Sequence, residues 1–518
     1  MSDAERERDL RNRDAPLEMN AEEFRSLGHR TVDRIADFLA SLPNLPVTAA
    51  EVPSVVRASL PDGPVPASGM PAQRLLEETG ALLLGHSLFN GHPRFFGYIT
   101  SSAAPIGALG DLLAASVNPN VGGWNLSPIA SEIEAQTVRW IAELIGYPSD
   151  CGGILVSGGN MANFVAFLAA RKAKASWDIR AEGLHGHPRF TLYVSAETHT
   201  WIQKAADLFG FGTDAIRWIP VDSDRRMDIA ALEREVVRDR QDGLAPLLVI
   251  GTAGTVAVGA IDPLRQIGAF CRREGLWFHV DGAYGAPAAM LPEAPADLKA
   301  LADADSVAVD PHKWLYAPLE AGCTLVRDRR HLPEAFSFHP EYYAFAGEEE
   351  ELRTNYHEWG PQNSRGFRAL KVWLGIRQVG REGYLRMIRD DIALAEVLFM
   401  ACRDTPELEA VTHNLSIATF RFVPQDLRER PEVAEYLNEL NRELLERLQA
   451  GGEAFVSNAV LDGRFLLRAC IVNFRTSLAD VQALPEIVVR VGRAVDASLR
   501  SEKLGQLGEA PGRASSGK

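Results

Sequence analysis

The middle of the chain alternates short apolar runs with segments of helical periodicity, and this alternation constrains the fold more than any other feature. Apolar runs of strand length lie at residues 154–156, 190–194, 247–250, 276–280 and 306–309. Helices are predicted between them over 160–174, 200–208 and 263–275. Short apolar strands that alternate with helices form a mainly parallel sheet with both faces covered. The sequence therefore predicts a large α/β domain.

The segments on either side of this region follow other patterns. Apolar residues recur at helical spacing over 20–42, and the proline-rich stretch 43–71 is predicted to be extended. The last third predicts helices over 384–401 and 432–448, a strand over 415–422 and a hairpin that turns at 461–463. We therefore expect an N-terminal helical segment over 1–100, a large α/β domain over 101–385, a small α+β domain over 386–504 and a disordered tail over 505–518.

Charge and composition argue against several classes of partner. The chain of 518 residues has 54 basic and 69 acidic residues, which give a formal net charge of −15. This acidic balance disfavours nucleic acid and anionic membranes as partners, and no apolar run approaches the ~18 residues needed to cross a bilayer. The five cysteines form no Cys-x-x-Cys pair, no His-Glu-x-x-His motif is present, and the N-terminus is charged without an apolar leader region. We therefore expect a cytoplasmic protein with no metal site.

Small and polar residues follow the predicted strands, at the edge where parallel sheets bind their ligands. The first strand ends in Ser157-Gly-Gly-Asn160 before a helix, and such a helix N-terminus can bind phosphate. His199 follows the second strand. The fourth strand ends in His279-Val-Asp-Gly-Ala283, and the fifth is followed by Asp310-Pro-His-Lys-Trp314. Each feature alone is commonly plain turn or helix-cap chemistry.

Taken together, these residues fit one small ligand. A phosphate suits the glycine turn, an aromatic ring can stack on His199, a protonated ring nitrogen can pair with Asp281, and an aldehyde can react with Lys313. A lysine beside apolar strands is unusual, and a desolvated lysine amine is a nucleophile for carbonyls. Pyridoxal 5′-phosphate (PLP) has all four groups, so the sequence predicts PLP as cofactor.

The motifs and their order resemble those of the group II pyridoxal-phosphate-dependent amino acid decarboxylases, most nearly the aromatic L-amino acid decarboxylase branch. The resemblance covers roughly residues 15 to 500. It is carried by His92-Pro-Arg-Phe-Phe-Gly-Tyr98, Ser127-Pro128, Ser157-Gly-Gly-Asn160, His199, His279-Val-Asp-Gly-Ala283, Asp310-Pro-His-Lys-Trp314, Tyr356-His-Glu-Trp359 and Arg365-Gly-Phe-Arg-Ala-Leu-Lys371. It implies the fold of the type I PLP-dependent transferases and a homodimer with active sites at the subunit interface.

The resemblance also implies roles for individual residues. Lys313 would hold the cofactor as a Schiff base, Asp281 would serve the ring nitrogen, and His199 would stack over the ring. The implied cofactor-binding residues are Gly159, Asn160, His199, Thr255, Asp281, Ala283, His312 and Lys313. The implied catalytic residues are Lys313, His199, Asp281 and Tyr356, the last as a proton donor on a loop over 340–364, where Tyr342 and Tyr343 are alternatives.

These expectations indicate a carboxy-lyase that converts an L-amino acid, of the tryptophan, tyrosine, phenylalanine or dopa type, to its amine and CO2. The substrate pocket is predicted at Tyr98, Asn120, Gly122 and Trp124. Two alternatives share the cofactor: an aldehyde synthase that couples decarboxylation to oxidative deamination, and a decarboxylase of glutamate, aspartate or histidine. A further alternative, of another class, is a non-catalytic protein that only binds PLP.

Overall fold

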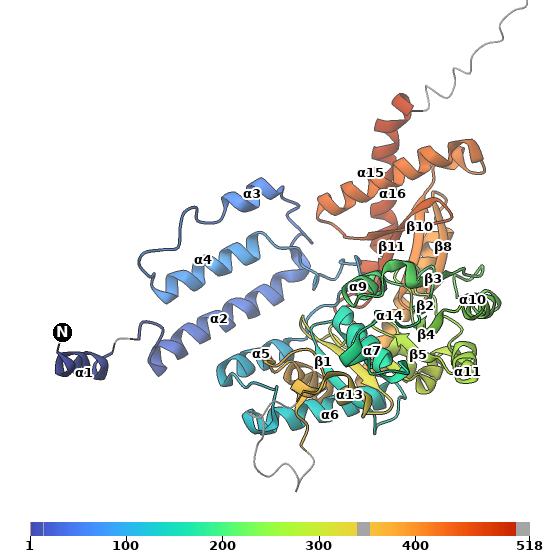
Figure 1. The fold of residues 1–518 in the computed structure, drawn as a ribbon. Helices are drawn as coiled ribbons and strands as arrows, with labels where there is room; N and C mark the ends of the chain where they lie inside the picture. The colour runs from blue at the N-terminus through green and yellow to red at the C-terminus, as the bar shows by residue number, and fades with distance from the viewer. Residues whose placement is uncertain (1, 14, 339–352, 504–518) are drawn as a thin grey trace, which may run out of the picture. The chain divides into compact units, whose positions relative to one another are not determined.

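The computed structural model describes residues 2–13, 15–338 and 353–503. The chain divides into two compact units, one of residues 1–89 with 450–452 and the other of residues 90–449 with 453–518 (Figure 1). The domain boundaries predicted at residues 100 and 385 stay predictions, and the predicted tail over 505–518 lies outside the described residues.

The first unit is helical. It contains α1 (Asp3–Arg11), α2 (Ala21–Ser41), α3 (Pro53–Ala58) and α4 (Ala72–Gly85). The Asn20 side chain caps α2 by accepting hydrogen bonds from the backbone N–H groups of Glu22 and Glu23. The prediction that residues 43–71 are extended is wrong for α3, which begins at Pro53. Proline fits the first turn of a helix because its missing N–H would have no partner there.

A seven-stranded sheet forms the centre of the second unit. Its strands are β1 (Gly152–Val156), β2 (Phe190–Ser195), β3 (Ile216–Ile219), β4 (Ala245–Thr252), β5 (Trp277–Asp281), β6 (Ser306–Val309) and β7 (Gly322–Val326). The strand order is β1-β7-β6-β5-β4-β2-β3, and only β7 runs antiparallel to its neighbours. All five predicted strands are present, whereas β3 and β7 were not predicted.

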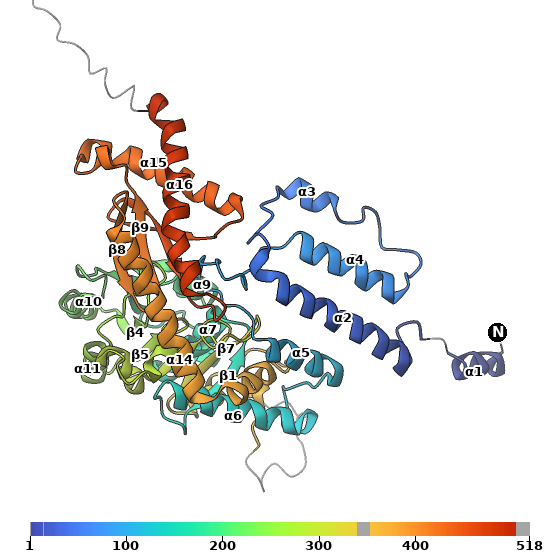
Figure 2. The same ribbon diagram turned by 180° about the vertical axis from the view of Figure 1, so that it is seen from behind.

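Alternate strand residues face two different cores. Leu155, Tyr193 and Val249 pack with α6 (Pro128–Leu144), α10 (Ile229–Gln241) and α11 (Leu264–Glu274). The neighbouring residues Ile154 and Leu192 pack instead with α7 (Gly159–Lys174) and α9 (Trp201–Leu208). Figure 1 shows α7 at the front of the unit, and Figure 2, which views it from behind, shows α14 at the front. The sheet is therefore covered on both faces, as its apolar strands require.

A second, antiparallel sheet lies towards the C-terminus. It has the order β10-β11-β9-β8 and comprises β8 (Leu408–Asn414), β9 (Ile417–Phe422), β10 (Ser457–Leu461) and β11 (Arg464–Cys470). Helices α15 (Ala434–Gly451) and α16 (Leu478–Lys503) share its core. The long α14 (Ala369–Asp404), interrupted at Gly380, packs on α6 and also on β8 and β9. The remaining helices are α5 (Pro105–Val117), α8 (Ile179–Glu182), α12 (Ala296–Lys299) and α13 (His331–Phe336).

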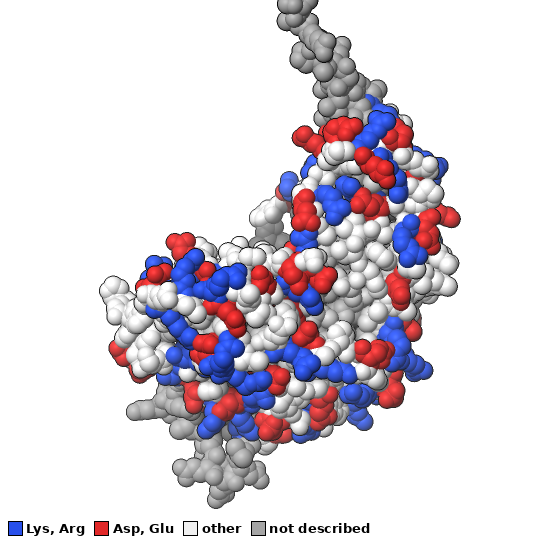
Figure 3. Space-filling model, turned by 90° about the vertical axis from the view of Figure 1, so that its right-hand side faces the viewer, with Lys and Arg blue, Asp and Glu red and all other residues white. Residues whose placement is uncertain are grey.

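The surface and the helices give further constraints. Acidic and basic side chains are interspersed over the face shown in Figure 3. No helix in the described part of the chain is long and apolar enough to cross a membrane. All five cysteines are free thiols. Among residues 2–13, 15–338 and 353–503, no three His, Cys, Asp or Glu side chains are grouped so that they could hold a metal ion.

Candidate active site

The turn between β1 and α7 offers an anion site. Gly158 has φ +90°, a conformation that residues with a side chain rarely adopt. A Cβ on Gly159 would lie 2.6 Å from Asp310 Oδ2, so only glycine allows this approach. No side chain caps the N-terminus of α7, which begins at Gly159 and continues through Asn160. The backbone N–H groups of this helix end are therefore available to a phosphate.

Lys313 and Asp310 form an ion pair directly after β6. Lys313 Nζ lies 2.9 Å from Asp310 Oδ2, and Asp310 is only 1% exposed. Burial lowers the pKa of Lys313, but the Asp310 carboxylate outweighs this effect, so the pKa lies above its usual value. Asp310 Oδ1 is buried without a hydrogen-bond partner. His312 stands beside the glycine turn, because its Cε1 would lie 3.4 Å from a Cβ on Gly158.

Asp281 is the last residue of β5, and two N–H donors fix its orientation. Trp201 Nε1 donates to Asp281 Oδ2 at 2.8 Å, and the Ala283 backbone N–H donates to Oδ1 at 3.2 Å. Thr255 follows the neighbouring strand β4, and its hydroxyl oxygen accepts a hydrogen bond from Ala260 N within the same loop. The carboxylate of Asp281 is thus presented at the carboxyl edge of the sheet.

His199 belongs to the same group of side chains. Its Nδ1 accepts a hydrogen bond from the backbone N–H of Trp201 at 3.2 Å. Burial lowers the pKa of His199; Asp281 opposes this effect, and Lys313 adds to it. The structure therefore brings His199, Asp281, Asp310 and Lys313 within electrostatic reach of one another.

The structure places Tyr356 elsewhere. Tyr356 lies in a short 3₁₀ helix (Tyr356–Glu358), is 1% exposed, and packs in the core that contains α7. The Arg365 guanidinium lies 4.8 Å from the centre of its ring, and Trp359 contacts it edge-on. Burial raises the pKa of the Tyr356 hydroxyl well above its usual value, and Glu134 adds to the increase. Within one chain, the structure does not bring Tyr356 to the Lys313 group, and Tyr342 and Tyr343 lie outside the described residues.

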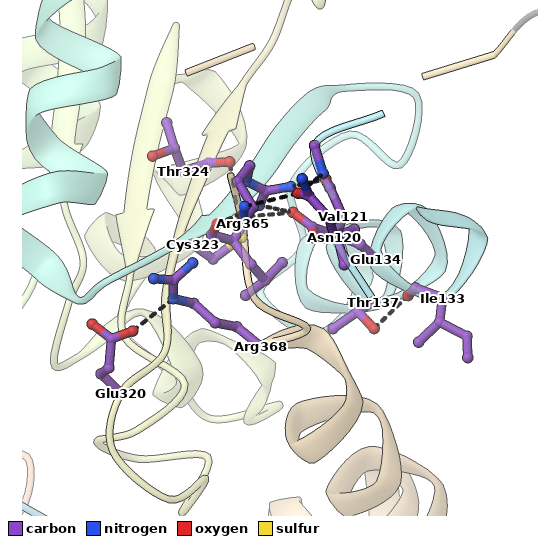
Figure 4. A network of polar contacts seen from close by, with 12 residues as sticks. Asn120, Val121, Ile133, Glu134, Thr137, Glu320, Cys323, Thr324, Arg365 and Arg368 are labelled. Atoms are coloured by element: carbon purple, nitrogen blue, oxygen red, sulfur yellow. Dashed lines mark hydrogen bonds and ion pairs between the residues drawn. The ribbon is translucent and has the colours of Figure 1, made fainter. Parts of the chain in front are cut away.

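The predicted pocket residues Asn120 and Gly122 join the network around Arg365. Figure 4 shows Asn120 beside Arg365 in this network. Asn120 Oδ1 accepts hydrogen bonds from the backbone N–H groups of Gly122 and Arg365, both at 3.0 Å. His357 N donates to Gly122 O at 2.9 Å, and a Cβ on Gly122 would lie 2.1 Å from Asn363 O. Gly122 is thus required by the close approach of residues 355–365.

The other two predicted pocket residues have separate surroundings. Trp124 Nε1 donates to Glu132 Oε1 at 2.7 Å, and the Arg353 guanidinium lies 4.9 Å from its ring. Tyr98 is 56% exposed, and its backbone carbonyl accepts a hydrogen bond from Arg468 in the small sheet. The structure does not gather Tyr98 and Trp124 into one local cluster, so the predicted pocket stays a prediction.

Several residues of the site were not assigned a role from the sequence. Trp201 orients Asp281 by a hydrogen bond. It stands two positions after His199, at the start of a helix, and this spacing was the sequence feature that could have indicated a role for it. Asn163 lies four residues after Gly159, on the same face of α7, and donates to the Gly159 carbonyl. The ion pair between Glu134 and Arg365 joins residues 231 positions apart, so no local sequence pattern predicts it.

Known proteins match nearly the whole of this architecture. The pyridoxal-dependent decarboxylase conserved domain matches residues 55–423, more than half of the chain. The chain belongs to this decarboxylase family. An aromatic-L-amino-acid decarboxylase of Bacillus atrophaeus is 33% identical over 471 residues, which are 90% of this chain and 94% of that protein. A phenylacetaldehyde synthase of Arabidopsis thaliana is 30% identical over 462 residues, which are 88% of this chain and 92% of that protein.

A solved structure gives the same result for the fold. The crystal structure of Oryza sativa TDC with PLP and tryptamine matches with a TM-score of 0.86 and 29% identity, covering 93% of this chain and 99% of that one. The predicted family, the type I architecture and the carboxy-lyase class are thereby confirmed. PLP as cofactor is confirmed on the same grounds.

The residues at the carboxyl edge of the sheet fit PLP chemically. The uncapped N-terminus of α7 suits its phosphate, and the half-buried Lys313 amine suits its aldehyde. The oriented carboxylate of Asp281 suits a protonated ring nitrogen, and His199 offers a flat ring for stacking. The orphaned Oδ1 of Asp310 leaves one buried acceptor at the site for a proton donor.

Proposed function

We propose that this decarboxylase acts on an aromatic L-amino acid and releases its amine and CO2, with Lys313 as the residue that binds PLP covalently. The observation that carries the site assignment is the ion pair of Lys313 with the buried Asp310, beside Asp281 and His199 at the ends of neighbouring strands. The aromatic substrate is supported by the relatives, which include an aromatic-L-amino-acid decarboxylase and tyrosine and tryptophan decarboxylases of plants.

Each residue of the site contributes a separate step. The N-terminus of α7 and the Gly158–Gly159 turn would hold the phosphate, and Asp281, oriented by Trp201, would keep a proton at the ring nitrogen. PLP, when bound, supplies an electron-accepting ring that stabilises the charge left on the substrate as CO2 departs. Asp310 holds the Lys313 amine in its protonated form, so Lys313 must lose a proton before it reacts with an aldehyde.

A tyrosine is proposed to donate the proton that replaces CO2 on the substrate carbon. The burial of Tyr356 between Arg365 and Trp359 is better suited to packing than to proton transfer, since its hydroxyl would have to leave this core to reach a substrate. We therefore propose Tyr342 or Tyr343 as the donor, the two alternatives that the sequence left open.

A homodimer is proposed on the basis of exposed apolar side chains on helices. In the first unit, Phe24 and Ile35 on α2 and Leu83 on α4 are each about half exposed. In the second unit, α5 exposes Leu109, Leu112, Leu113 and Val117. Contiguous exposed apolar groups of this kind are typical of subunit interfaces. Analytical ultracentrifugation of the full chain should give the mass of a dimer, and a monomer at micromolar concentration would contradict the proposal.

A cytoplasmic location is proposed from the chemistry of the cysteines. All five are free thiols, and burial raises the pKa of Cys271, Cys323 and Cys402 above their usual values. Free, buried thiols are typical of proteins in a reducing compartment. Fractionation of the source cells with an antibody against the chain would test the location.

The substrate is tested by a product screen. The purified chain, loaded with PLP, would be incubated with separate L-amino acids: tryptophan, tyrosine, phenylalanine, dopa, histidine, glutamate and aspartate. Mass spectrometry should find the amine of an aromatic amino acid. Aldehyde with hydrogen peroxide would favour the synthase reaction, which consumes O2 and water and releases ammonia, and which the phenylacetaldehyde synthase relative makes the second candidate. An amine from glutamate, aspartate or histidine alone would overturn the aromatic assignment.

A further inference from the structure

A chain of buried hydrogen bonds runs beneath the proposed cofactor site, from β5 and β6 to the first turn of α7. Trp277 Nε1 donates to Ser306 Oγ at 2.8 Å, and Ser306 Oγ lies 2.8 Å from His279 Nδ1. His279 Nε2 lies 2.7 Å from Asn163 Oδ1, and Asn163 Nδ2 donates to Gly159 O at 2.9 Å. All of these side chains are nearly inaccessible to solvent, with His279 only 2% exposed.

The groups at the two ends of this chain fix the directions of the bonds that they make. The indole N–H of Trp277 can only donate, so Ser306 Oγ accepts from it and keeps its own hydrogen for donation to an unprotonated His279 Nδ1. At the other end, the Gly159 carbonyl can only accept, so Asn163 presents its amide N–H₂ to Gly159 and its oxygen to His279. Asn163 Oδ1 can only accept, so His279 carries a hydrogen on Nε2, and a neutral imidazole of this form satisfies both contacts. Burial lowers the pKa of His279 to about 4, which agrees with this form.

The same imidazole also supports the other end of the site. The Trp201 ring packs edge-on against His279, with ring centres 5.8 Å apart, and Trp201 Nε1 donates to Asp281 Oδ2. His279 thus contacts two arms, one leading through Asn163 to the glycine turn and the other through Trp201 to Asp281. Neither arm places His279 itself against a ligand.

We propose that His279 is a positioning residue for the cofactor, acting through Asn163 on the phosphate-binding turn and through Trp201 on Asp281. This inference rests on the proposed cofactor site at Lys313. The Asn163 arm fixes the Gly159 peptide, whose orientation determines where the N–H groups at the start of α7 point. The Trp201 arm fixes the carboxylate that faces the ring nitrogen.

Two conservative variants separate the bonds of His279. In His279→Gln the side-chain amide nitrogen can occupy the place of Nε2 and keep the donor towards Asn163. In His279→Asn the shorter side chain can replace only Nδ1, so Asn163 loses its donor. Asn163→Leu removes the same link from the other side and keeps the branched shape of the side chain. Thr324→Val is the matched control, because Thr324 Oγ1 also donates a buried hydrogen bond to the backbone of α7, at Ala162 O.

The readout is the ratio of two dissociation constants, for PLP and for pyridoxal, which lacks the phosphate. Each would be measured on the full-length apo chain by absorbance titration. We expect Asn163→Leu to weaken PLP about tenfold with little effect on pyridoxal. His279→Asn should weaken both ligands, but PLP about tenfold more than pyridoxal, whereas His279→Gln and Thr324→Val keep the wild-type ratio. Trp201→Phe should weaken both ligands by a similar factor, because Asp281 serves the ring that both share.

Three results would overturn the proposal or its basis, and they are distinguishable. An unchanged ratio in both His279→Asn and Asn163→Leu would refute the positioning role, and either variant alone suffices if the other does not fold. An equal loss in Thr324→Val would show a general loosening of α7. The proposed site itself would be refuted if the wild-type chain, after borohydride reduction and peptide mass mapping, carried the cofactor on a residue other than Lys313.

Discussion

The buried ion pair between Glu134 and Arg365 gives a quantitative test of how residues 355–365 are held (Figure 4). Both side chains are essentially inaccessible, and Arg365 Nη2 lies 2.5 Å from Glu134 Oε1. Arg365 also donates to the carbonyls of Val121 and Leu155, and Glu134 Oε1 accepts from Leu155 N. One guanidinium therefore joins α6, β1 and the segment that contains the predicted pocket residues.

Replacing Glu134 by Gln keeps the shape but leaves the Arg365 charge buried without a counter-charge. Removal of one partner from a buried pair costs about 3–5 kcal/mol. Arg365→Met should cost a comparable amount, because it strands the Glu134 carboxylate and the two carbonyls. The double variant Glu134→Gln/Arg365→Met should be less destabilised than either single variant, because it removes both charges together.

The assay is urea unfolding of the apo chain, followed by tryptophan fluorescence. The matched control is Glu293→Gln, which breaks an exposed pair with Arg389 that has similar geometry, and which should leave the unfolding midpoint unchanged. Single variants at Glu134 and Arg365 that unfold at the wild-type midpoint would refute the reasoning. So would a double variant whose loss equals the sum of the single losses.

Three further outcomes are expected. Burial raises the pKa of Asp391 to about 7, so the folded chain binds more protons than the unfolded chain between about pH 4 and 7, and stability should fall as pH rises through this range. Asp391→Asn should lack this pH dependence, so its free energy of unfolding should rise relative to that of the wild type by up to about 1.4 kcal/mol per pH unit. Chemical unfolding at several pH values measures this difference. Free energies of unfolding that change in parallel with pH for the two proteins would contradict the assignment. Asp281→Asn should lower kcat at least about a hundredfold, measured as amine formed per second, while retaining bound cofactor; wild-type kcat would exclude the ring-nitrogen role. Either Tyr342→Phe or Tyr343→Phe should shift the product from amine to aldehyde. Tyr356→Phe should still form the amine, because Tyr356 is buried. Aldehyde from Tyr356→Phe alone would identify Tyr356 as the proton donor.

Much of the fold was predictable because its strands are short, apolar and separated by amphipathic helices. The strand β5 was recognised from an apolar run that ends in an acid, and the structure has it over Trp277–Asp281. The strand β7 was missed because it begins with Gly322 and carries Thr324, and because it pairs antiparallel between β1 and β6. Its place in the sheet depends on partners far along the chain, which local periodicity does not report.

The positions of the candidate site residues were predictable where these residues directly follow strands. Asp281 and Lys313 could be found because the carboxyl ends of parallel strands meet at one edge. The surroundings of Tyr356 could not be predicted from its motif, because a Tyr-x-x-Trp spacing fits a buried 3₁₀ turn as well as a mobile loop. The decisive contact, with Arg365, depends on a fold in which that guanidinium is already fixed by Glu134.

The most direct test of the central claim is the release of labelled CO2 from carboxyl-labelled aromatic L-amino acids, measured together with the amine. Wild-type chain loaded with PLP should release one CO2 for each amine formed, without consuming O2, and Lys313→Ala should release none under the same conditions. CO2 released by Lys313→Ala at the wild-type rate, or no CO2 from any aromatic amino acid with PLP bound to Lys313, would contradict the account.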